Sequence, residues 1–176
     1  ILKKIVLINW HYLRFETLEL DKINFLTGKN GAGKTTIIDA IQLLMLGDTT
    51  GHFFNKSASD KSSRTLKGYL RCEIGDDDNG NMLYLRNGRF TSYVVGEFYD
   101  DVNDEYMTVG VAFDNYEDGS IDYKYFSYDG PIPENKFVIN KLPLSIKELK
   151  VYLLETYYKS QISFFETNSS YREFIK

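Results

Sequence analysis

The residues best suited to chemistry lie between positions 28 and 35, which read Gly-Lys-Asn-Gly-Ala-Gly-Lys-Thr. They match the pattern G-x-x-x-x-G-K-[ST] at every fixed position. Glycines at this spacing let a loop curl so that successive backbone N–H groups point at one centre. An apolar stretch precedes the loop and a helical pattern follows it, and the positive end of such a helix attracts anions. The sequence therefore predicts a phosphate-binding loop over residues 28–35.

The side chains of this loop predict ATP and Mg²⁺ as its ligands. Lys34 is expected to reach the β- and γ-phosphates, which makes it the candidate catalytic residue. The Thr35 hydroxyl is the expected Mg²⁺ ligand, and Thr36 is placed to donate to the α-phosphate. The predicted nucleotide-binding residues are Asn30, Gly31, Ala32, Gly33, Lys34, Thr35 and Thr36.

A complete phosphate-loop hydrolase also needs an acidic residue on a second core strand and a group that positions water. The one candidate is Asp114, at the end of Val109–Asp114, but Asn115 stands where a catalytic Glu would follow. The apolar alternation of Val109, Val111 and Phe113 is more typical of a half-buried hairpin strand. Because the chain also has no Ser-Gly-Gly signature, we expect it to hold one half of an ATPase site.

A second candidate site is the locally basic segment 56–71, which carries five cations and one acid. We expect Arg64 and Lys67 to contact either DNA phosphates or the nucleotide. Because Gly68 and Leu70 are expected to face the core of a strand, Lys67 and Arg71 are expected on its opposite, wetter face. A solvated loop and strand face is the structural alternative, since most charge runs lie in solvent. Contacts to DNA phosphates would be independent of sequence and sensitive to salt.

Composition sets limits on the rest of the chain. The 176 residues are 43% hydrophobic and 26% charged, which is typical of a folded domain and excludes a disordered tail. The net charge of −4 gives no general affinity for polyanions, so a nucleic-acid surface must be local. The single cysteine, Cys72, excludes an internal disulfide and fits a reducing compartment. No apolar run is long enough for a membrane span, and we expect no membrane partner.

The elements that position these residues are predicted from hydrophobic periodicity and turn residues. We expect α/β architecture with a mixed sheet and a large antiparallel component. The expected strands of the first half are Ile5–Trp10 and Tyr12–Leu20 with a turn near His11, then Ile23–Thr27 and Leu66–Ile74. The expected helix is Thr35–Leu46, with a loop over Thr49–Thr65.

Antiparallel hairpins are predicted over residues 82–128. The first joins Met82–Leu85 to Phe90–Tyr99 through Asn87-Gly88, and the second joins Tyr106–Asp114 to Ile121–Tyr128. A capping box of Ser145 and Glu148 predicts a helix over 146–158, and Ser170 with Glu173 predicts another at the chain end. Because that helix is cut short and the chain opens on Ile1, we expect a fragment of a longer protein.

Several stretches together resemble one family. They are Leu7–Trp10, Leu18–Asp21, Gly28–Thr36 and Ile38–Gln42. Together they resemble the N-terminal head lobe of structural-maintenance-of-chromosomes (SMC) ATPases. His52–Asn55 and Ser62–Leu70 resemble the insertion of the MukB-like branch, and Leu66–Arg71 is most similar to JetC-type SMC subunits of the bacterial Wadjet anti-plasmid systems.

The resemblance implies an ABC/SMC-type head assembled from both ends of a long coiled-coil chain. The C-terminal lobe of the same chain would supply the metal-side acid, the catalytic Glu and the signature motif. ATP would lie between two heads of a homodimer, with kleisin-like and accessory subunits and DNA as further partners in the bacterial cytoplasm, at the nucleoid or on plasmids. The resemblance also implies a Q-loop glutamine, for which Gln161 is the candidate, whereas Gln42 is interpreted as structural. The assembled head would hydrolyse ATP and this fragment alone would not.

Alternatives of other classes remain at this stage. Within the family, a chromosome-organising head of the MukB or MksB kind is the alternative to plasmid defence. Outside it, the chain could be a self-contained nucleotide enzyme such as a small-molecule kinase, although it has no Arg-rich lid. A third possibility is a non-hydrolysing module that uses ATP to hold a partner.

Overall fold

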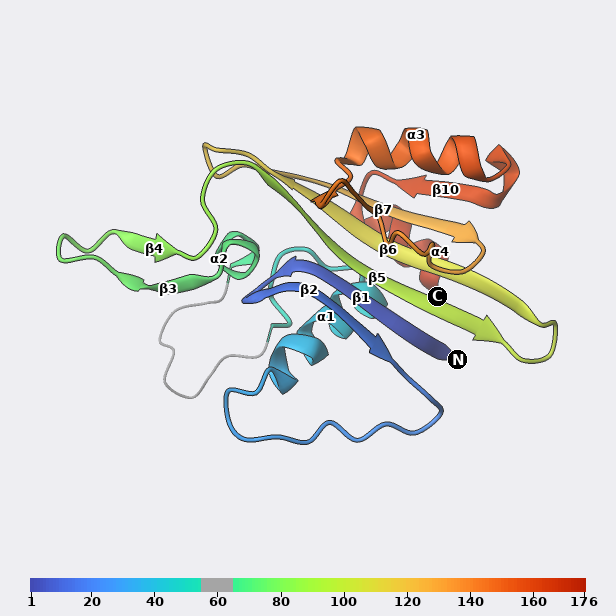
Figure 1. The fold of residues 1–176 in the computed structure, drawn as a ribbon, viewed down its shortest axis with the longest axis horizontal. Helices are drawn as coiled ribbons and strands as arrows, with labels where there is room; N and C mark the ends of the chain where they lie inside the picture. Colours follow the sequence, from blue (N-terminus) through green and yellow to red (C-terminus); the bar gives the residue numbers. More distant parts are fainter. Residues whose placement is uncertain (55–64) are drawn as a thin grey trace.

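The computed structural model describes residues 1–54 and 65–176 and is built on one six-stranded sheet (Figure 1). The strand order is β10-β7-β6-β5-β1-β2, and every pair within the described residues is antiparallel. The strands are β1 (Leu2–Trp10), β2 (Leu13–Glu19), β5 (Phe90–Asp100), β6 (Glu105–Asn115), β7 (Ile121–Asp129) and β10 (Ile162–Phe165). The large antiparallel component is therefore confirmed, whereas the expected parallel pairing is not found in this sheet.

Helices cover both faces of the sheet (Figure 1). Two small ribbons complete the fold, β3 (Glu73–Asp76) with β4 (Met82–Tyr84), and β8 (Val138–Ile139) with β9 (Leu142–Pro143). The helices are α1 (Lys34–Leu46), α2 (Leu66–Arg71), α3 (Ile146–Thr156), the short 3₁₀ helix η1 (Lys159–Gln161) and α4 (Asn168–Ile175). None of the helices in the described ranges is long and apolar enough to cross a membrane.

Strand alternation divides the core into two layers. Ile5 and Leu7 of β1 face α1, α2 and α4, where they pack with Leu43, Leu70 and Tyr171. Val6 and Ile8 face the opposite way and pack with Leu149 and Leu153 of α3. Because successive side chains of a strand point to opposite faces, the continuous apolar run of β1 suits a strand buried on both sides.

The local signals of the sequence are confirmed at several elements. The hairpin of β1 and β2 turns at His11, and α1 begins one residue before its predicted start. The β6–β7 hairpin forms as expected, with Asp118 and Gly119 in its turn. The Ser145–Glu148 capping box is present, and α3 ends at Thr156, two residues before the predicted boundary.

The predicted strand Ile23–Thr27 is wrong, because this segment forms no strand. Its backbone pairs with no strand of the described chain, and β2 forms the edge of the sheet on that side. Ile23 is 77% exposed and Phe25 is 85% exposed. The apolar side chains of this segment, which indicated a buried strand, are therefore exposed on the surface of the described structure.

The predicted strand Leu66–Ile74 is also wrong, since Leu66–Arg71 forms helix α2. The Thr65 side chain caps this helix by accepting from the Gly68 amide at 3.0 Å. Tyr69 and Leu70 are buried on one face. In so short a segment, apolar residues that alternate as in a strand also fit the i, i+3 and i+4 spacing of a helix. The Thr65 N-cap favours the helix over the strand.

Two further boundaries differ from prediction. Residues 82–85 and 90–99 do not form a hairpin, because β4 pairs with β3 and β5 pairs with β1 and β6. The Asp77 carboxylate closes the β3–β4 turn by accepting from the amides of Asn79 and Asn81. Helix α4 is capped by Thr167 rather than Ser170, which lies at the third position of the helix.

Candidate functional site: the phosphate loop

The phosphate loop links the exposed segment before it to the N-terminus of α1 (Figure 1). Gly31 and Gly33 have φ angles of +83° and +95°, in the left-handed region that favours glycine. The Ala32 amide donates to the Lys29 carbonyl at 3.1 Å, which closes a turn inside the loop. The glycines of the motif are therefore required by the backbone path, as the pattern predicts.

The Lys34 side chain folds back across the loop. Its Nζ donates to the carbonyl oxygens of Gly28 at 2.5 Å and Lys29 at 2.9 Å. These contacts hold the ammonium group over the loop, where the β- and γ-phosphates of a nucleotide are expected. Lys34 has no carboxylate partner among the described residues, so a bound anion would be the first group to neutralise its charge.

The N-terminus of α1 is open to an anion. Its N-cap residue is Gly33, no side chain caps it, and its first turn contains no acidic residue. The amides of residues 33–36 donate to no other described residue, and the first helical bond runs from the Ile37 amide to the Gly33 carbonyl at 3.1 Å. Free amides and the positive end of the helix dipole at one place fit the phosphates of ATP.

Thr35 and Thr36 occupy different environments in the first turn of α1. Thr35 is exposed and its hydroxyl has no partner in the described chain, so it is accessible to a metal ion. Thr36 is only 4% exposed, and its carbonyl accepts from Trp10 Nε1 at 2.9 Å. The proposed roles in binding Mg²⁺ and the α-phosphate stay predictions.

Tyr12, in the β1–β2 turn, lies directly against the loop. A Cβ atom added to Gly33 would lie 2.1 Å from the Tyr12 hydroxyl oxygen, which is far inside van der Waals contact. Gly33 is therefore required twice, by its positive φ and by the close approach of this phenol. Sequence reasoning missed Tyr12, because nothing in the spacing of residues 12 and 33 indicates that they touch.

The Asp114 carboxylate has a structural role. It accepts from the Thr91 hydroxyl at 2.9 Å and from the Ile146 amide, the first of α3, at 3.3 Å. An acidic group at a helix N-terminus is stabilising, and Asp114 is only 8% exposed. These contacts support the strand interpretation over a metal-side role, and the described residues contain no cluster of three or more His, Cys, Asp or Glu that could hold a metal ion.

The basic segment 56–71 is described only from Thr65 onward, and Arg64 lies outside the described residues together with Lys56 and Lys61. Lys67 is exposed, and its Nζ lies 5.6 Å from the centre of the Tyr84 ring. Arg71 is only 4% exposed and donates to the carbonyls of Gly88 and Tyr116. The expectation that Arg71 points to a wet face is wrong, because that expectation assumed a strand in place of α2.

Of the two glutamines, Gln161 lies far from the phosphate loop and Gln42 lies on the helix that follows the loop. Gln161 lines a cavity with Ile1 and Tyr99, at the start of β1. The loop lies near the opposite end of β1, about 30 Å away for a strand of nine residues. Gln42 lies on α1, and its Oε1 is buried without a hydrogen-bond partner among the described residues. A Q-loop role for Gln161 has no support in this arrangement.

Buried aromatic side chains hold α1 at both ends. Near the N-terminus of α1, Trp10 Nε1 donates to the Thr36 carbonyl, and the Tyr69 hydroxyl donates to the Asp39 carboxylate at 2.9 Å. At the other end, the hydroxyls of Tyr125 and Tyr171 donate to the carbonyls of Leu43 and Leu44 at 3.1 and 2.6 Å. The high aromatic content was the one sequence signal for these anchors, and it did not show which residues they contact.

The comparisons with known proteins agree with this geometry. The family model described as the P-loop containing region of an AAA domain matches residues 2–61, which include β1, β2, the phosphate loop and α1. No curated protein matches the chain. The match covers about a third of the 176 residues and supports a P-loop NTPase. Residues 2–61 are therefore similar to a P-loop containing region of the AAA type.

Proposed function

We propose that the chain is the phosphate-loop half of an SMC-type ATPase head, which binds ATP with Mg²⁺ and hydrolyses it only after a second lobe completes the site. The observation that carries this proposal is the exposed apolar segment Ile23–Thr27, which enters the phosphate loop without pairing to any described strand. A phosphate loop is normally fixed by a strand before it and a helix after it. Here the helix is in place, whereas the segment before the loop forms no strand and has no strand beside it among the described residues.

Helix α1, which follows the phosphate loop, also carries exposed apolar side chains. Phe25 is 85% exposed, and the outer face of α1 presents Ile38, Met45 and Leu46 at 41% to 45% exposure. An apolar surface beside an unpaired backbone is typical of an interface with further strands. A lobe that adds strands next to Ile23–Thr27 would pair this backbone and bury these side chains together.

The chemistry of the loop also favours a contribution from a second lobe. The loop supplies Lys34, free amides and the Thr35 hydroxyl, but no acidic residue that would hold the metal from the other side. The nearest sequence candidate, Asp114, is occupied by Thr91 and α3. In the proposal the C-terminal lobe of the same chain supplies that acid and the catalytic Glu, and a second head closes over the nucleotide.

The finer assignment depends on the sequence resemblance. We propose the MukB-like branch, with kleisin-like and accessory subunits and DNA as partners, acting in the bacterial cytoplasm against plasmids as Wadjet systems do. Chromosome organisation by a MukB or MksB-like head is the related alternative. The segment Leu66–Leu70, whose Tyr69 reaches Asp39 on α1, supports the branch by its sequence alone.

Nucleotide binding and turnover measured together test the proposal. The chain alone should bind ATP in calorimetry and show almost no steady-state hydrolysis. Addition of the C-terminal lobe encoded by the same gene should restore turnover, and Phe25→Asp should prevent that restoration without reducing ATP binding by the chain alone. Asn24→Asp is a matched control, since it adds the same single negative charge to the same exposed segment without removing an apolar side chain.

Two outcomes would contradict the proposal. Multiple-turnover hydrolysis by the chain alone, or transfer of phosphate to a small molecule, would favour a self-contained P-loop enzyme. ATP binding without hydrolysis in every combination would favour a module that uses ATP to hold a partner.

A further inference from the structure

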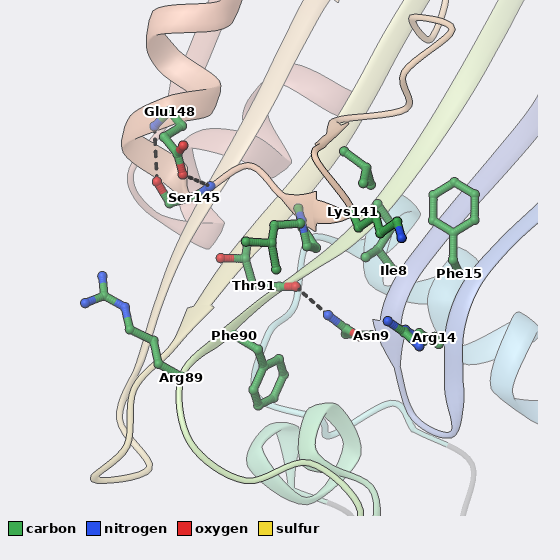
Figure 2. Close-up of a pocket in the computed structure, with 13 residues that line it drawn as sticks. Ile8, Asn9, Arg14, Phe15, Arg89, Phe90, Thr91, Lys141, Ser145 and Glu148 are labelled. Atoms are coloured by element: carbon green, nitrogen blue, oxygen red, sulfur yellow. Dashed lines mark hydrogen bonds between the residues drawn. The ribbon is translucent and has the colours of Figure 1, made fainter.

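The structure contains a second candidate binding site on the face of the sheet opposite α1. A cavity of about 610 Å³ lies between the β8–β9 hairpin, β2 and the first residues of β5, and we refer to it as the hairpin pocket (Figure 2). Its apolar lining includes Ile8, Phe15, Phe90, Val138 and Leu142. Binding sites for small organic molecules fall in this size range and are lined mainly by apolar and aromatic groups.

Cations surround this apolar lining. Arg14, Arg89 and Lys141 line the hairpin pocket, and Arg14 and Lys141 have no hydrogen-bond or ion-pair partner within the described residues. In the view of Figure 2 both lie on the side of the pocket next to Phe15. Arg89 lies 5.0 Å from the centre of the Tyr116 ring.

Glu148 is the single acid that lines the hairpin pocket. Its carboxylate accepts from the Ser145 amide at 3.0 Å, so it is already engaged at the start of α3 (Figure 2). The lining therefore has three cations against one engaged carboxylate, in a chain whose net charge is −4. A local excess of positive charge in an acidic chain favours an anionic ligand.

Lys141 occupies a backbone position that does not suit lysine. Asn140 and Lys141 form the two-residue turn between β8 and β9, with φ angles of +52° and +65°. Two positive φ angles define a turn in which Asn-Gly is the preferred pair. Lysine at the glycine position strains the backbone, and such strain is typical of positions kept for function. A role of the Lys141 ammonium group in the hairpin pocket would explain why lysine occupies this turn position instead of glycine.

We infer that the hairpin pocket binds a small organic anion with a flat apolar body. The anionic group would lie between Arg14 and Lys141, and the body would lie against Phe15 and Phe90. Phosphate and carboxylate are both suitable anionic groups, because guanidinium and ammonium donors bind either one. The site is separate from the phosphate loop, so it does not depend on the proposed ATPase function.

Calorimetry with matched probes tests this site in the Lys34→Ala background, where the phosphate loop is disabled. The probes are 1-naphthyl phosphate, 1-naphthoate and the neutral 1-naphthalenemethanol. We expect at least one anion to bind about tenfold more tightly than the neutral probe. The anion that binds more tightly identifies the natural anionic group.

Two variants that each remove one positive charge test whether the anion binds in the hairpin pocket. Lys141→Gly should weaken anion binding about fivefold or more, and it should keep or raise the melting temperature, because glycine relieves the strained turn. Lys147→Gln removes an exposed cation of α3 that does not line the hairpin pocket, and it should leave the affinity unchanged. The inference fails if neither anion binds at about 1 mM, if Lys141→Gly leaves the affinity unchanged, or if both variants reduce it equally.

Discussion

The indole Nε1 of Trp10 donates to the backbone carbonyl of Thr36 at 2.9 Å, and both residues are buried. This bond joins the last residue of β1 to the first turn of α1, directly behind the phosphate loop. The Trp10 ring also packs against Tyr69 of α2 at 4.6 Å between ring centres. One side chain therefore links the sheet, the loop helix and α2.

Trp10→Phe should weaken this link without opening a large cavity. The phenyl ring keeps most of the apolar contact but leaves the Thr36 carbonyl without its side-chain donor. A lost buried hydrogen bond and a partial void cost about 2–3 kcal/mol of unfolding free energy. Urea unfolding measures this loss, and calorimetry should show weaker ATP binding because the first turn of α1 is less well held. Equal stability of the variant and the wild type would contradict the role of this bond.

Lys34→Ala removes the ammonium group that lies over the loop carbonyls. We expect ATP affinity to fall by about tenfold or more, because a charged hydrogen-bond donor to phosphate is lost. The fold should be kept, since the contacts of Lys34 lie within the loop itself. Calorimetry at fixed Mg²⁺ measures the affinity, and Lys29→Ala is the charge-matched control. Equal affinity in the wild type and Lys34→Ala would exclude the phosphate-loop interpretation.

Some signals that lie within a few residues of each other predicted their elements well, although Asn87-Gly88 and the pair Ser170 and Glu173 did not. The Ser145 and Glu148 side chains satisfy each other's backbone amides, so the start of α3 is encoded locally. The phosphate loop is encoded in the same way, because its glycines are needed for their own φ angles. Pairing between distant strands is different. Val6 pairs with Val95 across almost ninety residues, and many apolar segments could have taken that place.

The errors in the candidate site have both local and long-range origins. The alternation of Leu66, Gly68 and Leu70 predicts a strand with Arg71 facing solvent, but Thr65 caps a helix in which Arg71 is buried. The apolar composition of Ile23–Thr27 predicts a strand, but a strand requires a neighbour, and no described strand pairs with this segment. The contact of Tyr12 with Gly33 depends on the tertiary path of the chain, and hydrophobic periodicity in the sequence gives no information about that path.

Thr35→Ala keeps the start of α1 but deletes the exposed hydroxyl that we predict to bind Mg²⁺. In the completed head, affinity for ATP with Mg²⁺ should fall several-fold more than affinity measured with a chelator present. Calorimetry under the two conditions separates a metal ligand from a general defect of the loop. Thr35→Ser, which retains the hydroxyl, should restore the dependence on Mg²⁺. An identical loss with and without metal would assign Thr35 another role.

Asp114→Ala tests whether this carboxylate belongs to the metal site or to the fold. Its contacts to Thr91 and to the first amide of α3 predict a loss of about 1–2 kcal/mol in unfolding free energy, as for a helix cap. The Mg²⁺ dependence of ATP binding should be unchanged. A variant that unfolds normally but loses Mg²⁺-dependent binding would restore Asp114 as a metal-side residue.

Lys67 and Arg71 lie one helical turn apart on α2 and carry the same charge, but only Lys67 is exposed. If the basic segment binds DNA, Lys67→Glu should weaken binding to all sequences alike and lower the salt slope by roughly one unit. Arg71→Gln should instead destabilise the fold by about 2–4 kcal/mol, because the guanidinium is buried and its part-buried hydrogen bonds to the carbonyls of Gly88 and Tyr116 are lost. DNA titrations at several salt concentrations and urea unfolding measure the two effects. If Lys67→Glu reduces ATP binding or head closure while DNA affinity stays level, Lys67 senses nucleotide across the head interface and the DNA interpretation is wrong.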